Sequence, residues 1–211
     1  MKIKLKTVAL LFAATTVASL PAQAIVVTFN GLTGGTVAPN GAISYASPLV
    51  SDGYIFTTLP FFDGRPGEFA TWTTASDANA TFSNHTGPIS IFSNSGRPTT
   101  MMASNGVPFN VSSLSLGYVF RGGAVITVNL SGALVGGGSV TQTFVTAAGD
   151  SALRTVTLIG FAGLSAFTIA QSGGNEAFQF NNINVQAVPE TSTALMLSLG
   201  LVTLIVVRRK A

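Results

Sequence analysis

Cysteine is absent from this 211-residue chain, so neither a disulfide framework nor a thiolate metal site can form. Charged residues make up only 8% of the sequence, whereas a soluble domain usually contains about a quarter. Histidine occurs once, as His85, which leaves no histidine cluster for zinc. A domain of this length can bury roughly two thirds of the surface of its unfolded chain, so it needs no disulfides.

The few positive charges lie mostly at the two ends. Three lysines fall within the first six residues, and Arg208-Arg209-Lys210 nearly ends the chain. Between Ile25 and Val188, four arginines stand against six acidic residues, so that stretch is mildly acidic despite the sequence pI near 9.6. Because phosphate binding needs a basic patch, we expect no nucleic-acid partner.

The N-terminus has the three parts of a signal peptide. Lysines precede an apolar run over residues 8–20, and Ala22-Gln23-Ala24 is a small-x-small cleavage box. This order predicts a signal peptide over residues 1–24, read by the Sec export machinery and cleaved to leave Ile25 first. An ordinary N-terminal helix is the alternative.

The C-terminus has a second three-part pattern. Val188-Pro189-Glu190-Thr191-Ser192 precedes an uncharged apolar run over about residues 193–207, and Arg208-Arg209-Lys210 follows. The run is at the short end for a transmembrane helix. The basic cluster should stay cytoplasmic, which places the body outside. A buried C-terminal helix of the domain is the alternative.

This tail, residues 188–211, resembles the PEP-CTERM sorting signal, whose usual motif is Val-Pro-Glu-Pro-Ser-Thr. The match covers Val188, Pro189, Glu190, Ser192 and Thr193, and it departs at Thr191. The resemblance implies processing by an exosortase in a Gram-negative bacterium that makes extracellular polysaccharide. It implies an inner-membrane intermediate and then a place at the cell surface or in the biofilm matrix. Tails of the PEP-CTERM kind are also known by the name ice-binding protein C-terminal domain.

The body predicts an all-β fold. Short alternating or β-branched runs, separated by glycine- or asparagine-rich turns, recur every 10–15 residues. The three-glycine run at 136–138 favours a hairpin, because no P-loop lysine follows it. We expect a jelly-roll-like β-sandwich over residues 25–187, with its clearest strands at 25–30, 54–58, 124–130, 139–145, 153–159, 164–170 and 177–185.

Three segments of the body resemble the jelly-roll, galactose-binding-like carbohydrate modules: residues 27–30, 106–114 and 178–185. In those modules the acidic residues of these motifs sometimes hold calcium. Here Asn30 and Asn181 stand instead, and calcium prefers carboxylates, so we expect no metal and no cofactor. In the last segment Phe178 and Phe180 hold even positions and Ile183 an odd one, so a regular strand would place them on opposite faces. Either a bulge at residues 181–182 resets the phase or both faces are buried.

Catalysis has little support in the sequence. His85 and Asp77 could join one of many serines, but a solvated loop histidine explains His85 better. Asp52-Gly53 and Asp63-Gly64 are typical of turns. The prediction is therefore a protein that is not an enzyme, with a secreted carbohydrate-active hydrolase as an unfavoured alternative. Ice binding would need a regular threonine array, and only Thr141-x-Thr143 and Thr155-x-Thr157 suggest one.

Binding is the favoured activity, because aromatic rings can stack on sugar faces while amides and short acids bind hydroxyls. Trp72 and Tyr54 are the candidate ligand-binding residues, with Tyr45 and Tyr118 behind them and core packing as the alternative for each. The irregular stretch 60–106 is where a ligand site is expected. The sequence predicts an exported surface or matrix protein that binds extracellular polysaccharide; the alternative is a passive structural matrix protein without a discrete ligand.

Overall fold

The computed structural model describes residues 23–37, 42–72, 90–119, 124–148, 152–173 and 178–188, with the side chain of Trp72 excepted. All regular structure in these ranges is β-strand, which confirms the all-β prediction. Two strands coincide with their predicted ranges, 54–58 and 139–145. The strands are β1 (Ala24–Val27), β2 (Thr36–Val37), β3 (Ala42–Ala46), β4 (Leu49–Ser51), β5 (Tyr54–Thr58), β6 (Glu68–Trp72), β7 (Phe92–Ser93), β8 (Thr99–Ala103), β9 (Phe109–Tyr118), β10 (Thr127–Leu134), β11 (Ser139–Val145), β12 (Arg154–Thr157), β13 (Leu164–Gln171) and β14 (Phe178–Ala187).

Residues Ala24–Ala187 form one compact unit. Ala22 of the predicted cleavage box and the sorting tail from Pro189 onward, with its apolar run and basic end, lie outside the described residues. So do His85 and Asp77. Among the residues that are described, none forms a helix long and apolar enough to cross a membrane.

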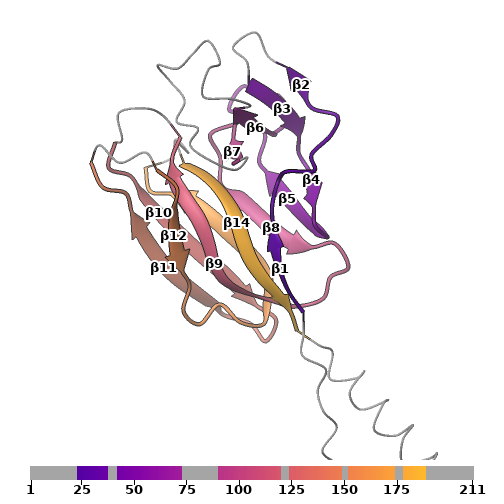
Figure 1. Cartoon of the computed structure of the whole chain (residues 1–211), viewed down its shortest axis with the longest axis vertical. Helices are drawn as coiled ribbons and strands as arrows, with labels where there is room; N and C mark the ends of the chain where they lie inside the picture. Colours follow the sequence, from indigo (N-terminus) through magenta and orange to yellow (C-terminus); the bar gives the residue numbers. More distant parts are fainter. Residues whose placement is uncertain are drawn as a thin grey trace, which may run out of the picture. The chain divides into compact units, whose positions relative to one another are not determined.

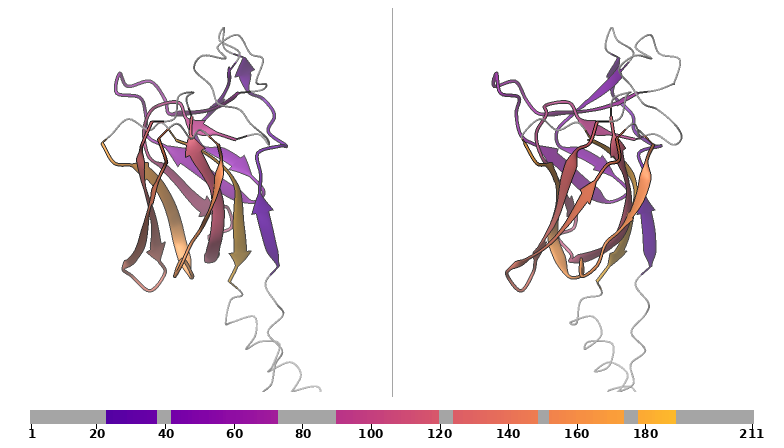
Figure 2. Two further views of the ribbon diagram at one scale, coloured as in Figure 1. Left: turned by 60° about the vertical axis from the view of Figure 1, so that its left-hand side comes forward. Right: turned by 90° about the vertical axis from the view of Figure 1, so that its left-hand side faces the viewer.

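Most strands belong to a sandwich of two layers (Figure 2). The four-stranded layer has the order β1-β14-β9-β12, and the six-stranded layer has the order β4-β5-β8-β13-β10-β11. The two layers join where Leu164 of β13 pairs with Phe109 of β9. Alternate residues of each strand point inward, as the two-residue period of a half-buried strand requires.

Phenylalanines fill the space between the layers. Phe29, Phe56 and Phe180 are fully buried, and the ring of Phe29 meets the other two edge-on at centroid distances of 5.2 and 5.7 Å. These rings come from three distant parts of the sequence, so the core ties the segment that follows β1 to β5 and to the last strand. Edge-to-face aromatic pairs of this kind add about 0.5–1.5 kcal/mol beyond the area they bury.

The last strand carries the predicted bulge. The pairing of β14 with β9 shifts register between Asn181 and Asn184, and Asn182 has a φ of +46°. The Asn182 N–H donates to Oδ1 of Asn181 at 2.6 Å. The side chains from Phe178 to Asn181 are also all buried. The strand therefore uses both of the alternatives that the sequence left open.

Two tight turns hold the six-stranded layer in register. Gly137 and Gly138 take φ of +90° and +82° between β10 and β11, which confirms the predicted hairpin. Asp52 and Gly53, with φ of +49° and +81°, form the two-residue turn between β4 and β5, where an Asp-Gly pair is strongly favoured. Asp52 also accepts a hydrogen bond from the Thr28 N–H at 2.8 Å, which fastens this turn to the end of β1.

A small sheet, with the order β2-β3-β6-β7, stands at the end of the unit away from Ala24 and Ala187 (Figure 1). It is attached to the sandwich by a bridge between Ile91 and Phe180. The Ser90 hydroxyl donates to the side-chain carbonyl of Gln179 beside that bridge. The loop that leaves β5 and enters β6, residues 59–67, is held where the Ser47 N–H donates to the Gly67 carbonyl at 3.0 Å.

Candidate functional site

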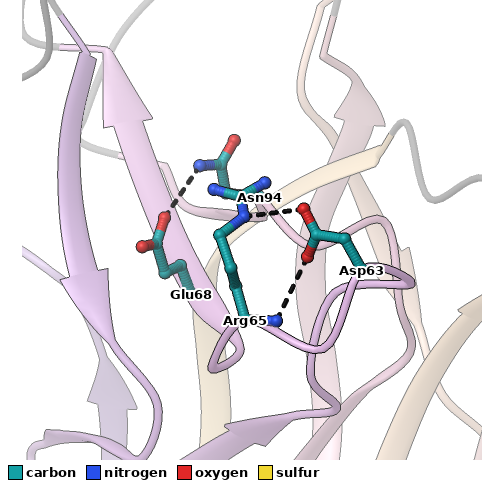
Figure 3. Close-up of polar contacts among 4 residues, drawn as sticks. All are labelled: Asp63, Arg65, Glu68 and Asn94. Carbon is teal, nitrogen blue, oxygen red and sulfur yellow. Dashed lines mark hydrogen bonds and ion pairs between the residues drawn. The ribbon is translucent and has the colours of Figure 1, made fainter.

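The β5–β6 loop is a closed turn whose shape follows from its own sequence. The Phe61 N–H donates to the Arg65 carbonyl at 2.9 Å, and the Gly64 N–H donates to the Phe61 carbonyl at 3.0 Å. Gly64 has a φ of +85°, as predicted for an Asp-Gly turn. The Asp63 carboxylate accepts from the Arg65 backbone N–H at 3.1 Å and from its side-chain Nε at 2.8 Å (Figure 3).

The turn presents two phenylalanine rings, each with a guanidinium over one face. The Arg65 guanidinium carbon lies 4.2 Å from the centre of the Phe61 ring, and that of Arg97 lies 4.0 Å from the Phe62 ring. Phe62 is 72% exposed, so much of this ring remains open to solvent. A cation–π contact at an exposed site contributes about 0.5–1 kcal/mol, which helps to hold each ring in place.

Charge is concentrated around these rings. The residues that the structure describes include six charged ones, and four of them are Asp63, Arg65, Glu68 and Arg97. Glu68 accepts a hydrogen bond from the Asn94 side-chain amide at 3.1 Å (Figure 3). Two cations and two anions cancel, so the surface is polar without a strong net field. We call the following seven residues the Phe62 cluster: Phe61, Phe62, Asp63, Arg65, Glu68, Asn94 and Arg97.

The hydrogen bonds from Arg65 hold the pKa of the Asp63 carboxyl below its usual value. This carboxylate therefore stays ionised at neutral pH and serves to shape the turn. A general acid for glycoside hydrolysis needs the opposite shift, a raised pKa. Asp63 is accordingly suited to accepting hydrogen bonds and unsuited to donating a proton.

A buried network of hydroxyls fixes the base of the cluster. Thr58 Oγ1 lies 2.8 Å from Ser93 Oγ and 3.0 Å from Ser95 Oγ, and the two serine hydroxyls are 3.0 Å apart. Thr58 is the last residue before the loop. The Arg97 N–H donates to Ser93 Oγ at 3.3 Å, so the same network places the arginine whose side chain covers Phe62. Buried hydroxyls that satisfy one another rigidify the backbone that carries them.

The residues predicted from the sequence fall elsewhere. Tyr54 is only 5% exposed and packs edge-on against Phe109 with ring centres 5.4 Å apart, so it is a core ring with no free face for a sugar. Burial raises the pKa of Tyr54 and of Tyr45, which is also buried. Tyr118 is half-buried in β9. Trp72 ends β6, and its side chain lies outside the described part of the chain.

The ligand residues predicted from the sequence do not include Phe61, Phe62 or Arg97. A signal for them exists: Pro60 and Pro66 bracket two adjacent phenylalanines that precede an Asp-Gly turn. Two neighbouring rings next to a turn cannot both point into the core. Nothing in the sequence predicts that Arg97 lies over Phe62, because this contact joins residues 35 positions apart.

Two hollows lie apart from the cluster. One of about 290 Å³ is formed by the loop 31–34 against Tyr45 and Leu49, and one of about 200 Å³ lies at the open edge of the sandwich beside Phe144 and Arg154. Within the described residues, no group of three or more histidine, aspartate or glutamate side chains could hold a metal ion. Asn181 uses its Oδ1 to accept the Asn182 N–H at the bulge of β14.

No protein-family model and no curated protein matches the chain. Among solved structures, it is similar to a point mutant of CBM29-2 complexed with mannohexaose, at 12% identity and a TM-score of 0.36, covering 80% of this chain and 93% of that one. A family 29 carbohydrate-binding module has 11% identity, a TM-score of 0.35 and coverages of 80% and 90%. The CBM22-1–GH10 modules of Clostridium thermocellum endo-1,4-β-D-xylanase 10B, complexed with xylohexaose, have 12% identity, a TM-score of 0.33 and coverages of 80% and 29%. At these TM-scores the likeness assigns neither a fold family nor a function to this chain.

Proposed function

We propose that this chain is an exported, non-enzymatic protein of the bacterial surface or extracellular matrix, and that its sandwich binds polysaccharide through the Phe62 cluster. The observation that carries the binding proposal is the exposed Phe62 ring, held by Arg97 and surrounded by hydrogen-bonding groups. An aromatic platform with a few fixed polar groups is the usual composition of a small-ligand site. Asp63, Glu68 and Asn94 supply carboxylate and amide groups within the same turn region.

The limits of the compact unit support the export proposal. The first strand begins at Ala24, the last residue of the predicted signal peptide, and the last strand ends at Ala187, just before the sorting motif. Cleavage after Ala24 would leave the other three β1 pairs, from Ile25↔Val185 to Val27↔Ile183, in place. Among the residues that the structure describes, every buried hydrophobic residue lies between Val27 and Val185. Removal of both predicted segments would therefore leave all of these residues in the chain.

Sorting by an exosortase and release from the inner membrane follow from the tail motif. Mass spectrometry of the protein from a Gram-negative host with an exosortase should show Ile25 as the first residue and no Arg208-Arg209-Lys210. A host that lacks the exosortase is the control, and there the basic end should remain. A surface form with an intact C-terminus in both hosts would mean a permanent anchor and would end the exosortase proposal.

Substitution of the exposed ring tests the binding proposal. Affinity electrophoresis of the full chain in detergent, through gels containing hydroxyethylcellulose, dextran or alginate, measures retardation by each polymer. Phe62→Ala should weaken the affinity for the retarding polymer by roughly tenfold, as loss of a central aromatic contact usually does. Arg97→Lys should weaken it less, because the charge remains while the planar stack is lost.

Ile159→Ala is the matched control for the ring substitution. Ile159 is 80% exposed and lies in another part of the unit, so its removal should leave retardation unchanged. Equal retardation of wild type and Phe62→Ala would remove the cluster from the proposal. No retardation by any polymer would favour a passive matrix protein, and release of reducing sugar would point to the hydrolase instead.

A further inference from the structure

The six-stranded layer has no charged residue in any of its strands. β4, β5, β8, β10, β11 and β13 contain no aspartate, glutamate, lysine or arginine. Protein surfaces usually carry charge on about a quarter to a third of their residues. The outer face of this layer is therefore electrically neutral over its full width, in contrast to the Phe62 cluster.

Hydroxyl side chains form a row across this outer face. Thr141 of β11 pairs with Ser131 of β10, Ser131 pairs with Thr168 of β13, Thr168 pairs with Thr100 of β8, and Thr100 pairs with Thr57 of β5. The five residues are successive cross-strand neighbours, so their spacing is that of adjacent strands, about 4.8 Å. We call these residues the hydroxyl row.

The hydroxyl row faces outward. Its members alternate with buried residues of the same strands, such as Leu130, Met101 and Ile169, and none of the five is itself buried. Thr100 Oγ1 and Thr168 Oγ1 lie 3.2 Å apart, which places two hydroxyls of neighbouring strands side by side. Each hydroxyl has one hydrogen and two lone pairs, so a pair that shares one bond keeps further hydrogen-bonding capacity.

A parallel row of small and apolar side chains lies two residues along the strands, a separation of about 7 Å. It contains Ala133 paired with Ala166, and Met102 paired with Ile55, which in turn pairs with Val50. Met102 is 39% exposed and Val50 is 58% exposed, so this row is open to solvent. The face thus offers hydroxyls and apolar groups in adjacent parallel lines.

This composition selects among classes of partner. A charged polymer would lose hydration at this face without finding an opposite charge, which is unfavourable. Strong protein–protein contacts centre on Trp, Tyr and Arg, and the outward residues of the two rows include none of these. A neutral polysaccharide presents hydroxyl edges and apolar C–H faces together, which the hydroxyl row and the apolar row match.

We propose that the outer face of the six-stranded layer is a second binding surface, which takes an uncharged polysaccharide chain laid across the strands along the hydroxyl row. This inference rests on the proposed polysaccharide binding and adds to it a surface and a class of polymer. A chain lying across five strands contacts the layer over about 19 Å, the length of four strand spacings. This second surface would bind through many weak neutral contacts in register, whereas the Phe62 cluster would bind through a single aromatic platform.

The test uses the full chain in detergent and affinity electrophoresis with two neutral probes, hydroxyethylcellulose and dextran, and one acidic probe, alginate. The triple variant Thr57→Val/Thr100→Val/Thr168→Val removes three hydroxyls with little change of shape and keeps β-branched side chains. We expect at least one neutral probe to bind the wild type roughly tenfold more tightly than this variant, because three neutral hydrogen bonds are lost. Alginate should not retard either protein through this face.

Thr155→Val/Thr157→Val is the matched control, because these exposed threonines lie on β12 of the opposite layer. It should bind as the wild type does, and circular dichroism with thermal unfolding of all variants checks that the fold is kept. If the triple variant binds neutral probes as the wild type does while Phe62→Ala loses binding, the second surface is overturned and the proposed function stands. If only alginate binds, or if sedimentation shows self-association that the triple variant abolishes, the neutral-polysaccharide surface is likewise overturned. If no probe binds, both proposals fail.

Discussion

The Phe62 cluster and the six-stranded layer are built on opposite principles. The cluster gathers four of the six charged residues among those described around one turn, where each arginine covers a phenylalanine. The layer has no charge at all and orders hydroxyls by strand pairing. In a chain with so little charge, the position of the charges marks a site more clearly than their number. The ordering of neutral groups marks a surface that a charge map would miss.

Phenylalanines from the two regions should differ greatly in their effect on stability. Phe56 in β5 is fully buried and meets Phe29 edge-on, so Phe56→Ala should lower the free energy of unfolding by about 3–5 kcal/mol. Phe62→Ala, four residues beyond the end of β5, should change it by about 0.5 kcal/mol or less. Urea titration of both variants, followed by fluorescence of the single tryptophan, Trp72, measures the difference.

Similar losses for the two alanine variants would break the comparison, because they would show that the cluster supports the fold as the core does. A large loss of stability for Phe56→Ala would sharpen it if this variant, under conditions where it is still folded, were retarded by the polysaccharide as the wild type is. The conservative variant Phe56→Leu separates cavity formation from loss of the edge-on ring contact. It should cost less than Phe56→Ala.

The smallest predicted effect is that of pH on the free energy of unfolding. Because the Arg65 hydrogen bonds lower the pKa of Asp63 in the folded state, the ion pair favours folding above the usual aspartate pKa, and this contribution disappears as the pH falls through the lowered value. An NMR titration should place the Asp63 carboxyl below an ordinary aspartate. Arg65→Gln should return it towards the ordinary value, whereas Thr57→Val in the six-stranded layer should leave it unchanged. A normal pKa in the wild type would show that the turn is not held by this pair.

The sequence predicts the strands better than it predicts the site. The hairpin of β10 and β11 follows from alternation and a three-glycine turn, and β11 matches its predicted range because both signals are local. The bulge at residues 181–182 is also predictable from the sequence. The apolar residues of this strand change from even to odd positions there, and a bulge is one of the few explanations for such a change. Tyr54 shows the limit of prediction from the sequence. A tyrosine in an alternating strand is compatible with a sugar-binding platform or with a place in the core, and the contact of Tyr54 with Phe109 shows that it belongs to the core. The cross-strand register that aligns Thr57 with Thr168 depends on pairings between distant segments. Strand pairing also decides where the two threonine pairs lie. Thr141/Thr143 and Thr155/Thr157 are in different layers, so they form no single array.

The pairing of the long strands β14 and β9 has a mechanical consequence for a chain held by its C-terminal end. Tension on a bound polymer would enter at the β5–β6 loop, beside the small sheet, and leave at Ala187, at the opposite end of the unit (Figure 1). It would reach β14 through the Ile91–Phe180 bridge and through the pairing with β1, but above all through the longer ladder that joins the two ten-residue strands, Phe109–Tyr118 and Phe178–Ala187. Load directed along paired strands is shared by all their hydrogen bonds at once. The strand next to the attachment point is thus the one best placed to resist being pulled out.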